Sequence, residues 1–132
     1  MKGIGLLFFA SGAVYVTIGM LWGIHMGASQ DFTLAPAHAH LNLVGFVTMA
    51  LMGLFYHLTP RAAASVLSRV HFGLATLGVW TMVPGIAMAE TGRGEGLAIV
   101  GSLLTAGAMA VFLVNLVVNV LLVKGRPVAE AA

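Results

Sequence analysis

Long apolar runs separated by short polar stretches dominate the hydrophobic pattern of this chain. Four runs are long enough to cross a bilayer, because a spanning helix needs about 20 apolar residues at a rise of about 1.5 Å each. They cover residues 4–27, 36–59, 67–89 and 96–123. The pattern therefore predicts an all-α integral membrane protein in which residues 1–132 form one domain of four spans.

The composition agrees with a membrane protein and limits which side chains can hold a metal or a haem. The chain is 60% hydrophobic, with only six Lys or Arg and four Asp or Glu residues, and its mean hydropathy is +1.03. Soluble domains carry about 25% charged residues. The absence of cysteine excludes disulfides, thiolate metal ligands, iron-sulfur clusters and covalently attached haem. Any metal or haem must therefore be held by histidine, methionine or oxygen.

The basic residues predict the topology. Lys2 precedes the first run, Arg61 and Arg69 lie between the second and third, and Lys124 and Arg126 follow the fourth. All five fall on one side, which the positive-inside rule makes cytoplasmic. We therefore expect both termini in the cytoplasm and a location in a bacterial inner membrane. Topology accounts for the net charge of +2, and without a clustered basic face we expect no nucleic-acid partner.

Small and polar residues predict how the spans pack. In the first run, Gly5, Gly12 and Gly19 recur every seven residues, and Gly19, Gly23 and Gly27 every four. Small residues on one helix face let another backbone approach closely within a membrane. We therefore expect this face to pack against a neighbouring span.

The fourth run is the most uniformly apolar, so we expect it to be the most exposed to lipid. Its only amide side chains are Asn115 and Asn119, one turn apart. A hydrogen bond to another helix is the expected role of such a pair.

Two histidines lie at the mouth of the second run, where ionisable residues are candidates for function. At about 100° per residue, His38 and His40 point about 200° apart, so one metal cannot take both from a straight helix. In a cyclic homo-oligomer, His38 of one protomer and His40 of the next would face each other across a cleft. A haem with two axial imidazoles fits such a cleft. Two alternatives stand beside it: rings lying among lipid headgroups and water, or a copper or zinc site.

The other histidines point less clearly to chemistry. We expect His25, near the end of the first run, to reach interfacial water. His57 lies 19 residues beyond His38, about 28 Å along a helix, and His71 is level with it on the next span. We expect His57 and His71 to form an exposed interfacial pair, with a metal site or a proton relay as alternatives.

The second run as a whole resembles the tenth membrane helix of the heme-copper oxidase catalytic subunit. The likeness rests on His38-Ala39-His40, Met52-Gly53, His57 and Pro60. In that family the first histidine of the pair is an axial ligand of the high-spin haem and the second of the low-spin haem. The related nitric oxide reductases are similar at His40 and Asn42. The resemblance implies a non-covalent haem b bound near the outer face, with His38 and His40 as axial ligands from adjacent protomers.

The resemblance also implies an assembly. The oxidase subunit has twelve spans in three arcs of four, and this chain is similar in size to one arc, so a homotrimer would resemble the whole subunit. In the family, arginines in the loop after the eleventh span pair with the haem propionates, and the corresponding loop here holds Arg93.

The function implied is that of a b-type cytochrome that transfers electrons to or from an unknown partner or senses redox state. The sequence has no His-His pair for the family's copper centre, so we do not expect a complete oxidase. The alternatives are a haem sensor of nitric oxide or carbon monoxide, and a structural or assembly protein without a cofactor.

Overall fold

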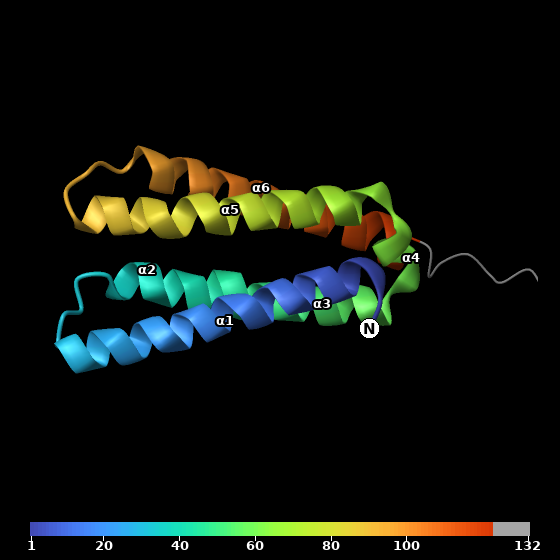
Figure 1. Cartoon of the computed structure of the whole chain (residues 1–132). Coiled ribbons are helices and arrows are strands. Elements are labelled where there is room, and N and C mark those ends of the chain that lie inside the picture. The colour runs from blue at the N-terminus through green and yellow to red at the C-terminus, as the bar shows by residue number, and fades with distance from the viewer. Residues whose placement is uncertain (123–132) are drawn as a thin grey trace, which may run out of the picture.

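The computed structural model describes residues 1–122, and in them the chain forms four long helical spans (Figure 1). The first span is α1 (Gly3–Ser29), and the third is α5 (Val66–Glu90). The second is built from α2 (Ala35–His40), the π-helical η1 (Leu41–Thr48) and α3 (Met49–Leu58), and the fourth from α6 (Gly96–Leu116) and η2 (Val117–Leu121). A short helix, α4 (Pro60–Ala64), joins the second span to the third. The all-α fold with four spans is confirmed.

Local sequence explains where the helices begin and turn. Pro36 lies in the first turn of α2 and Pro60 begins α4, positions where the missing proline N–H is not needed. In the loop between α5 and α6, Gly92 and Gly94 have φ angles of 72° and 105°. Glycine adopts this left-handed region without a steric penalty, so it permits the tight reversal that returns the chain as α6.

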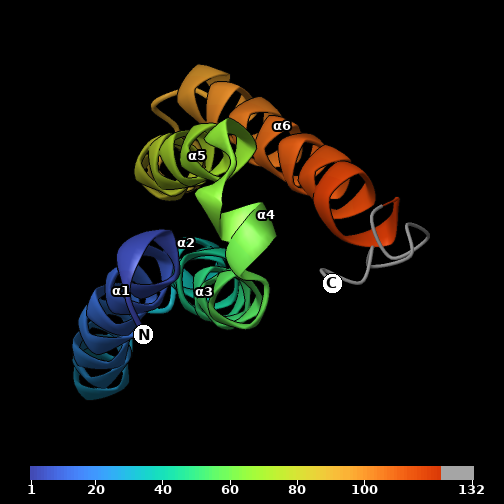
Figure 2. The same cartoon turned by 90° about the vertical axis from the view of Figure 1, so that its right-hand side faces the viewer.

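The spans pack as two hairpins (Figures 1 and 2). In the first, α1 packs on η1 and α3 through its glycine face. A Cβ atom added to Gly5 would lie 2.9 Å from the carbonyl oxygen of Gly53, and one on Gly12 would lie 3.2 Å from that of Phe46. The predicted close approach is therefore confirmed along α1, except at Gly27, which has no heavy atom of another residue within 4 Å of this position.

The second hairpin is formed by α5 and α6, which lie in contact along their length. Gly85 faces the backbone of Ala98, and Gly101 faces the backbone of Met82, so the helices meet with no side chain between them at these points. Within the single chain the fourth span is the least buried, with 11% of its most apolar 18 residues buried compared with 28% in each of the other spans. Its exposure to lipid stays a prediction.

A polar network links the two hairpins at the end that carries α4. Asn115 of α6 is fully buried and donates to Tyr56 Oη of α3 and to the Ala62 carbonyl of α4, each at 3.2 Å. It also accepts from Ser65 Oγ at 3.1 Å. The expected hydrogen bond between helices is thus confirmed for Asn115. Asn119 donates to Asn115 within the same span, at 2.7 Å.

The expectation of an exposed pair is wrong for His71. Its side chain is only 1% exposed, and its ring packs against Phe8 and Phe112, with centroids 4.8 and 5.4 Å away. His57 is exposed, as expected. The two residues differ because α3 turns Tyr56 into the bundle and His57 out of it, and Tyr56 is the residue that meets His71.

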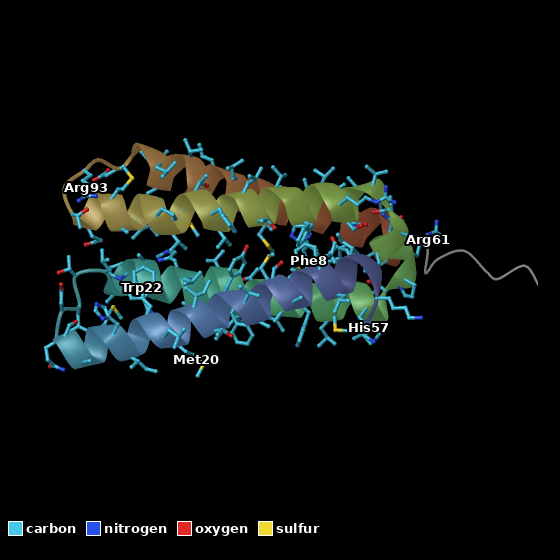
Figure 3. All side chains as sticks on the ribbon, in the orientation of Figure 1. Phe8, Met20, Trp22, His57, Arg61 and Arg93 are labelled. Atoms are coloured by element: carbon cyan, nitrogen blue, oxygen red, sulfur yellow. The ribbon has the colours of Figure 1, made fainter. Side chains whose placement is uncertain are left out.

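The charged residues divide between the two ends of the bundle. Arg61 lies at the end that carries α4 and the start of α1, and Arg93 lies at the opposite end (Figure 3). Lys124 and Arg126, which contributed to the predicted topology, lie outside the described residues. The orientation of this bundle in a membrane therefore stays a prediction.

Candidate functional site

A cleft of about 580 Å³ opens on the surface between α1 and the second span. Two polar side chains, His38 and Asn42, contribute to its wall. The rest is Gly23 and apolar side chains from both helices, namely Val16, Met20, Ile24, Leu43, Phe46 and Val47. A single imidazole in an apolar hollow of this size has the character of a small-molecule or cofactor site.

The ring of His38 is held against α1. The edge of Trp22 meets it, with ring centroids 6.1 Å apart and planes at 84°. A Cβ atom on Gly23 would lie 3.1 Å from His38 Cε1, closer than an ordinary contact. The absence of a side chain at Gly23 therefore leaves the room in which the ring lies.

Asn42, one turn beyond His38, holds its amide against that ring. Its amide nitrogen lies 3.1 Å from His38 Nε2, 3.5 Å from His38 Nδ1 and 3.2 Å from the His38 carbonyl oxygen. Because an amide NH₂ group only donates, the ring nitrogen and the carbonyl are the acceptors. A Cβ atom on Gly19 would overlap the Asn42 side chain. Glycine at this position thus gives Asn42 its place beside the histidine.

His40 lies two residues along the same helix in a different environment. It is exposed, does not line the cleft, and its Nδ1 lies 2.8 Å from the Pro36 carbonyl oxygen. A carbonyl only accepts, so His40 Nδ1 carries the proton and Nε2 keeps its lone pair. Metal-binding histidines commonly have this arrangement, with one N–H donated to a carbonyl and the other nitrogen presented to the metal.

Arg93 lies at the same end of the bundle as the cleft but does not line it (Figures 1 and 3). With Leu34, Ala87, Met88 and Thr91 it surrounds a separate cavity of about 280 Å³, beside the start of the second span. Four residues were expected to bind the cofactor. Within a single chain, only His38 and Asn42 lie together. His40 and Arg93 lie apart from that pair.

The chemistry of these residues fits a haem. Among residues 1–122, no three His, Asp or Glu side chains gather closely enough to hold a metal. Haem iron accepts one or two axial imidazoles and the macrocycle packs on apolar walls, and the His38 cleft and the Nε2 lone pair of His40 offer these groups.

Sequence reasoning missed several residues that shape these features. Met20 lines the cleft from α1, Trp22 packs against the His38 ring, and Tyr56 is the centre of the buried network. Trp22 and Met20 carried no signal beyond apolarity. Tyr56 did carry a sequence signal, because a tyrosine hydroxyl inside an apolar span needs a hydrogen-bond partner.

Fold and cleft together define an integral membrane four-helix protein whose second span carries a His-x-His pair at its mouth. The chain is similar to the heme-copper oxidase subunit I+III of Aeropyrum pernix, with 33% identity over 147 aligned positions that cover 93% of this chain. The similarity covers nearly the whole chain and supports the likeness to the heme-copper oxidase superfamily that its second span predicted. The chain spans 18% of the length of that relative. No protein-family model and no solved structure matches it.

Proposed function

We propose that this chain is a haem-binding membrane protein of the b-type cytochrome kind that transfers single electrons or senses redox state. The observation that carries the proposal is the cleft between α1 and the second span, where His38 is the one imidazole in an apolar wall. Its relative is named a heme-copper oxidase subunit, which supports haem as the ligand.

The two histidines would hold the haem from opposite sides. His40 is exposed and keeps the Nε2 lone pair free because its Nδ1 is bonded to Pro36. It is thus suited to reach a group held in the cleft of a neighbouring copy. His38 Nε2 lies 3.1 Å from the Asn42 amide nitrogen, so ligation through this ring nitrogen would exchange that contact for a bond to iron. A bound haem supplies reversible one-electron chemistry.

A homotrimer is the assembly proposed for this site. Three copies of a four-span chain give twelve spans, the number in the oxidase catalytic subunit. A heterologous contact that repeats from one copy to the next forms a closed ring. Arg93, at the same end as His38, is proposed to pair with a haem propionate. With both termini in the cytoplasm, this end faces outward. The electron donor and acceptor are left open by this proposal.

The test combines an absorption spectrum, haem extraction and subunit counting by native mass spectrometry. We expect purified protein to show low-spin bands of a bis-imidazole haem b at one haem per chain, in a trimer. His38→Ala and His40→Ala should each lose most of the haem. His25→Ala is the matched control, because His25 is an exposed histidine at the same end that does not line the cleft. Stoichiometric haem in the His38→Ala, His40→Ala double variant would contradict the proposal.

One observation favours a second function. His38 is the only histidine in the cleft of a single chain, so a haem bound there by one chain would have one protein ligand. Its other axial position would be open to nitric oxide or carbon monoxide. A five-coordinate reduced spectrum that shifts when the gas is added would support a gas sensor over an electron carrier. Colourless protein from cells supplied with haem would point to a structural role instead.

A further inference from the structure

A second cavity of about 560 Å³ lies at the opposite end of the bundle from the His38 cleft. It is lined by the start of α1 and by the junction of α3 and α4, including Lys2, Ile4, His57, Pro60 and Ala63. His38 and His57 are 19 residues apart along one span, about 28 Å. This cavity is therefore independent of the proposed haem site.

Beside this cavity, α1 and α3 approach each other closely. A Cβ atom on Gly5 would lie 2.9 Å from the Gly53 carbonyl oxygen and 3.2 Å from the His57 backbone nitrogen. This contact sets the first turn of α1 beside the last turn of α3. It thereby brings Lys2 and His57, which are 55 residues apart in sequence, to the wall of one cavity.

The two side chains share a chemistry suited to an anion. Both are exposed; Lys2 carries a positive charge, and the His57 ring offers an N–H donor whether it is neutral or protonated. The same cavity has apolar walls at Ile4, Pro60 and Ala63. Hydrogen-bond donors above apolar walls, at the end of membrane spans, match the headgroup and upper acyl chain of an anionic lipid.

We propose that this cavity binds an anionic phospholipid, with Lys2 and His57 on the phosphate and an acyl chain along Ile4 and Ala63. Arg61, at the same end of the bundle (Figure 3), adds positive charge that attracts such lipids. Basic pockets between spans on the cytoplasmic side are known to recognise anionic headgroups, and the topology proposed above places this end there. The cavity itself does not depend on haem binding.

Native mass spectrometry of the delipidated full chain tests the proposal, with phosphatidylglycerol and phosphatidylcholine of identical acyl chains as probes. Each basic side chain near a membrane surface contributes about fivefold in affinity for anionic lipid. We expect phosphatidylglycerol to bind at least about fivefold more tightly than phosphatidylcholine. The Lys2→Gln, His57→Gln double variant should lose that preference. Arg69→Gln is the matched control, because it removes one exposed charge that does not line the cavity.

Each of three results would overturn the inference. They are equal affinity for the two lipids, an unchanged preference in the double variant, and an equal loss in Arg69→Gln, which would indicate surface charge alone. Inorganic phosphate is added at millimolar concentration as a separate probe. Retention of phosphatidylglycerol supports a lipid site, whereas its displacement would make the site one for free phosphate. Helical circular dichroism verifies that both variants are folded.

Discussion

The hydroxyl oxygen of Tyr56 lies 3.0 Å from Nδ1 of His71, joining the second span to the third inside the bundle. The same hydroxyl accepts a hydrogen bond from the Asn115 amide. Its single proton is therefore free to point at His71, whose Nδ1 accepts it. Three spans thus meet at one phenol, and the network they form connects the two hairpins of the fold.

Replacement of Asn115 by leucine should weaken this connection. The variant loses the donors to Tyr56 and Ala62 and the acceptor for Ser65, and it leaves these partners buried without their bonds. Hydrogen bonds within membranes contribute about 0.6 kcal/mol on average and at most about 1.7, so several lost together should lower the free energy of unfolding by about 1–3 kcal/mol. Denaturation by sodium dodecyl sulfate, followed by circular dichroism, measures the change.

Asn119→Leu is the control for this prediction. Asn119 is half-buried and donates one hydrogen bond within its own span, so its replacement should cost less than about 1 kcal/mol. Equal effects of the two variants would show that Asn115 does not join the hairpins in the way we describe.

The contact between α5 and α6 should be sensitive to a single methyl group. A Cβ atom at Gly101 would overlap the backbone of Met82, and backbone cannot rotate away as a side chain does. We expect Gly101→Ala to lower the free energy of unfolding by about 1–3 kcal/mol, the usual cost of overpacking. Thermal unfolding in detergent provides the measurement.

Gly107→Ala on the same helix is the matched substitution. Apart from its own helix backbone, Gly107 has no heavy atom within 4 Å of the added carbon, so the higher helix propensity of alanine should raise the free energy of unfolding by about 0.5–1 kcal/mol. A comparable loss of stability at Gly107 would mean that the helix backbone, and not the contact with Met82, is sensitive to the change.

The room around His38 gives a prediction that tests the proposed haem site. In Gly23→Ala the new carbon would lie 3.1 Å from His38 Cε1, closer than an ordinary contact, so the ring must shift from its present position. A cost of about 1.4 kcal/mol corresponds to a tenfold change in affinity, and we expect haem affinity to fall by about that factor. Titration of apoprotein with hemin measures it. Gly27→Ala, with open space around the added carbon, should bind haem as the wild type does.

The loop between α1 and α2 contains a carboxylate with a lowered pKa. The backbone amide of Thr33 donates to Asp31 Oδ1 at 3.0 Å, and this bond holds the pKa of Asp31 below its ordinary value of 3.8. Because the folded pKa is the lower one, the stabilisation is complete above about pH 4 and is lost as the pH falls through the folded pKa. A carbon-detected NMR titration of the Asp31 carboxyl should give a midpoint below 3.8; a higher midpoint would contradict the hydrogen bond.

Much of this fold follows from sequence because a membrane leaves few choices. A run of about 20 apolar residues must be helical, which fixes the four spans. The glycine face of α1 predicted contacts that exist at Gly5 and Gly12. The burial of His71 could not be predicted from its position near a span end. It depends on which way α4 turns the chain and on Tyr56 and Phe112 from two other spans.

Only part of the candidate site could be predicted from the sequence. The spacing of His38 and His40 predicts two directions from one helix, and the structure gives the two rings different partners. The position of the His38 ring beside the cleft depends on Gly23 and Trp22 of α1, which contact it. No pattern within the second span indicates which residues of another helix will face it.

The π-helical segment from Leu41 to Thr48 lies between the His-x-His pair and the end of the span at His57. In this conformation the backbone bonds reach five residues back instead of four, so the segment is underwound relative to the turns on either side. If the same eight residues were wound as ordinary α-helix, the two halves of the span would rotate against each other by about 100°, the turn that one extra residue adds. His38 would then turn out of its groove on α1 while Tyr56 kept its partners. The direction in which the His38 and His40 rings point is thus set by a segment that contains neither residue.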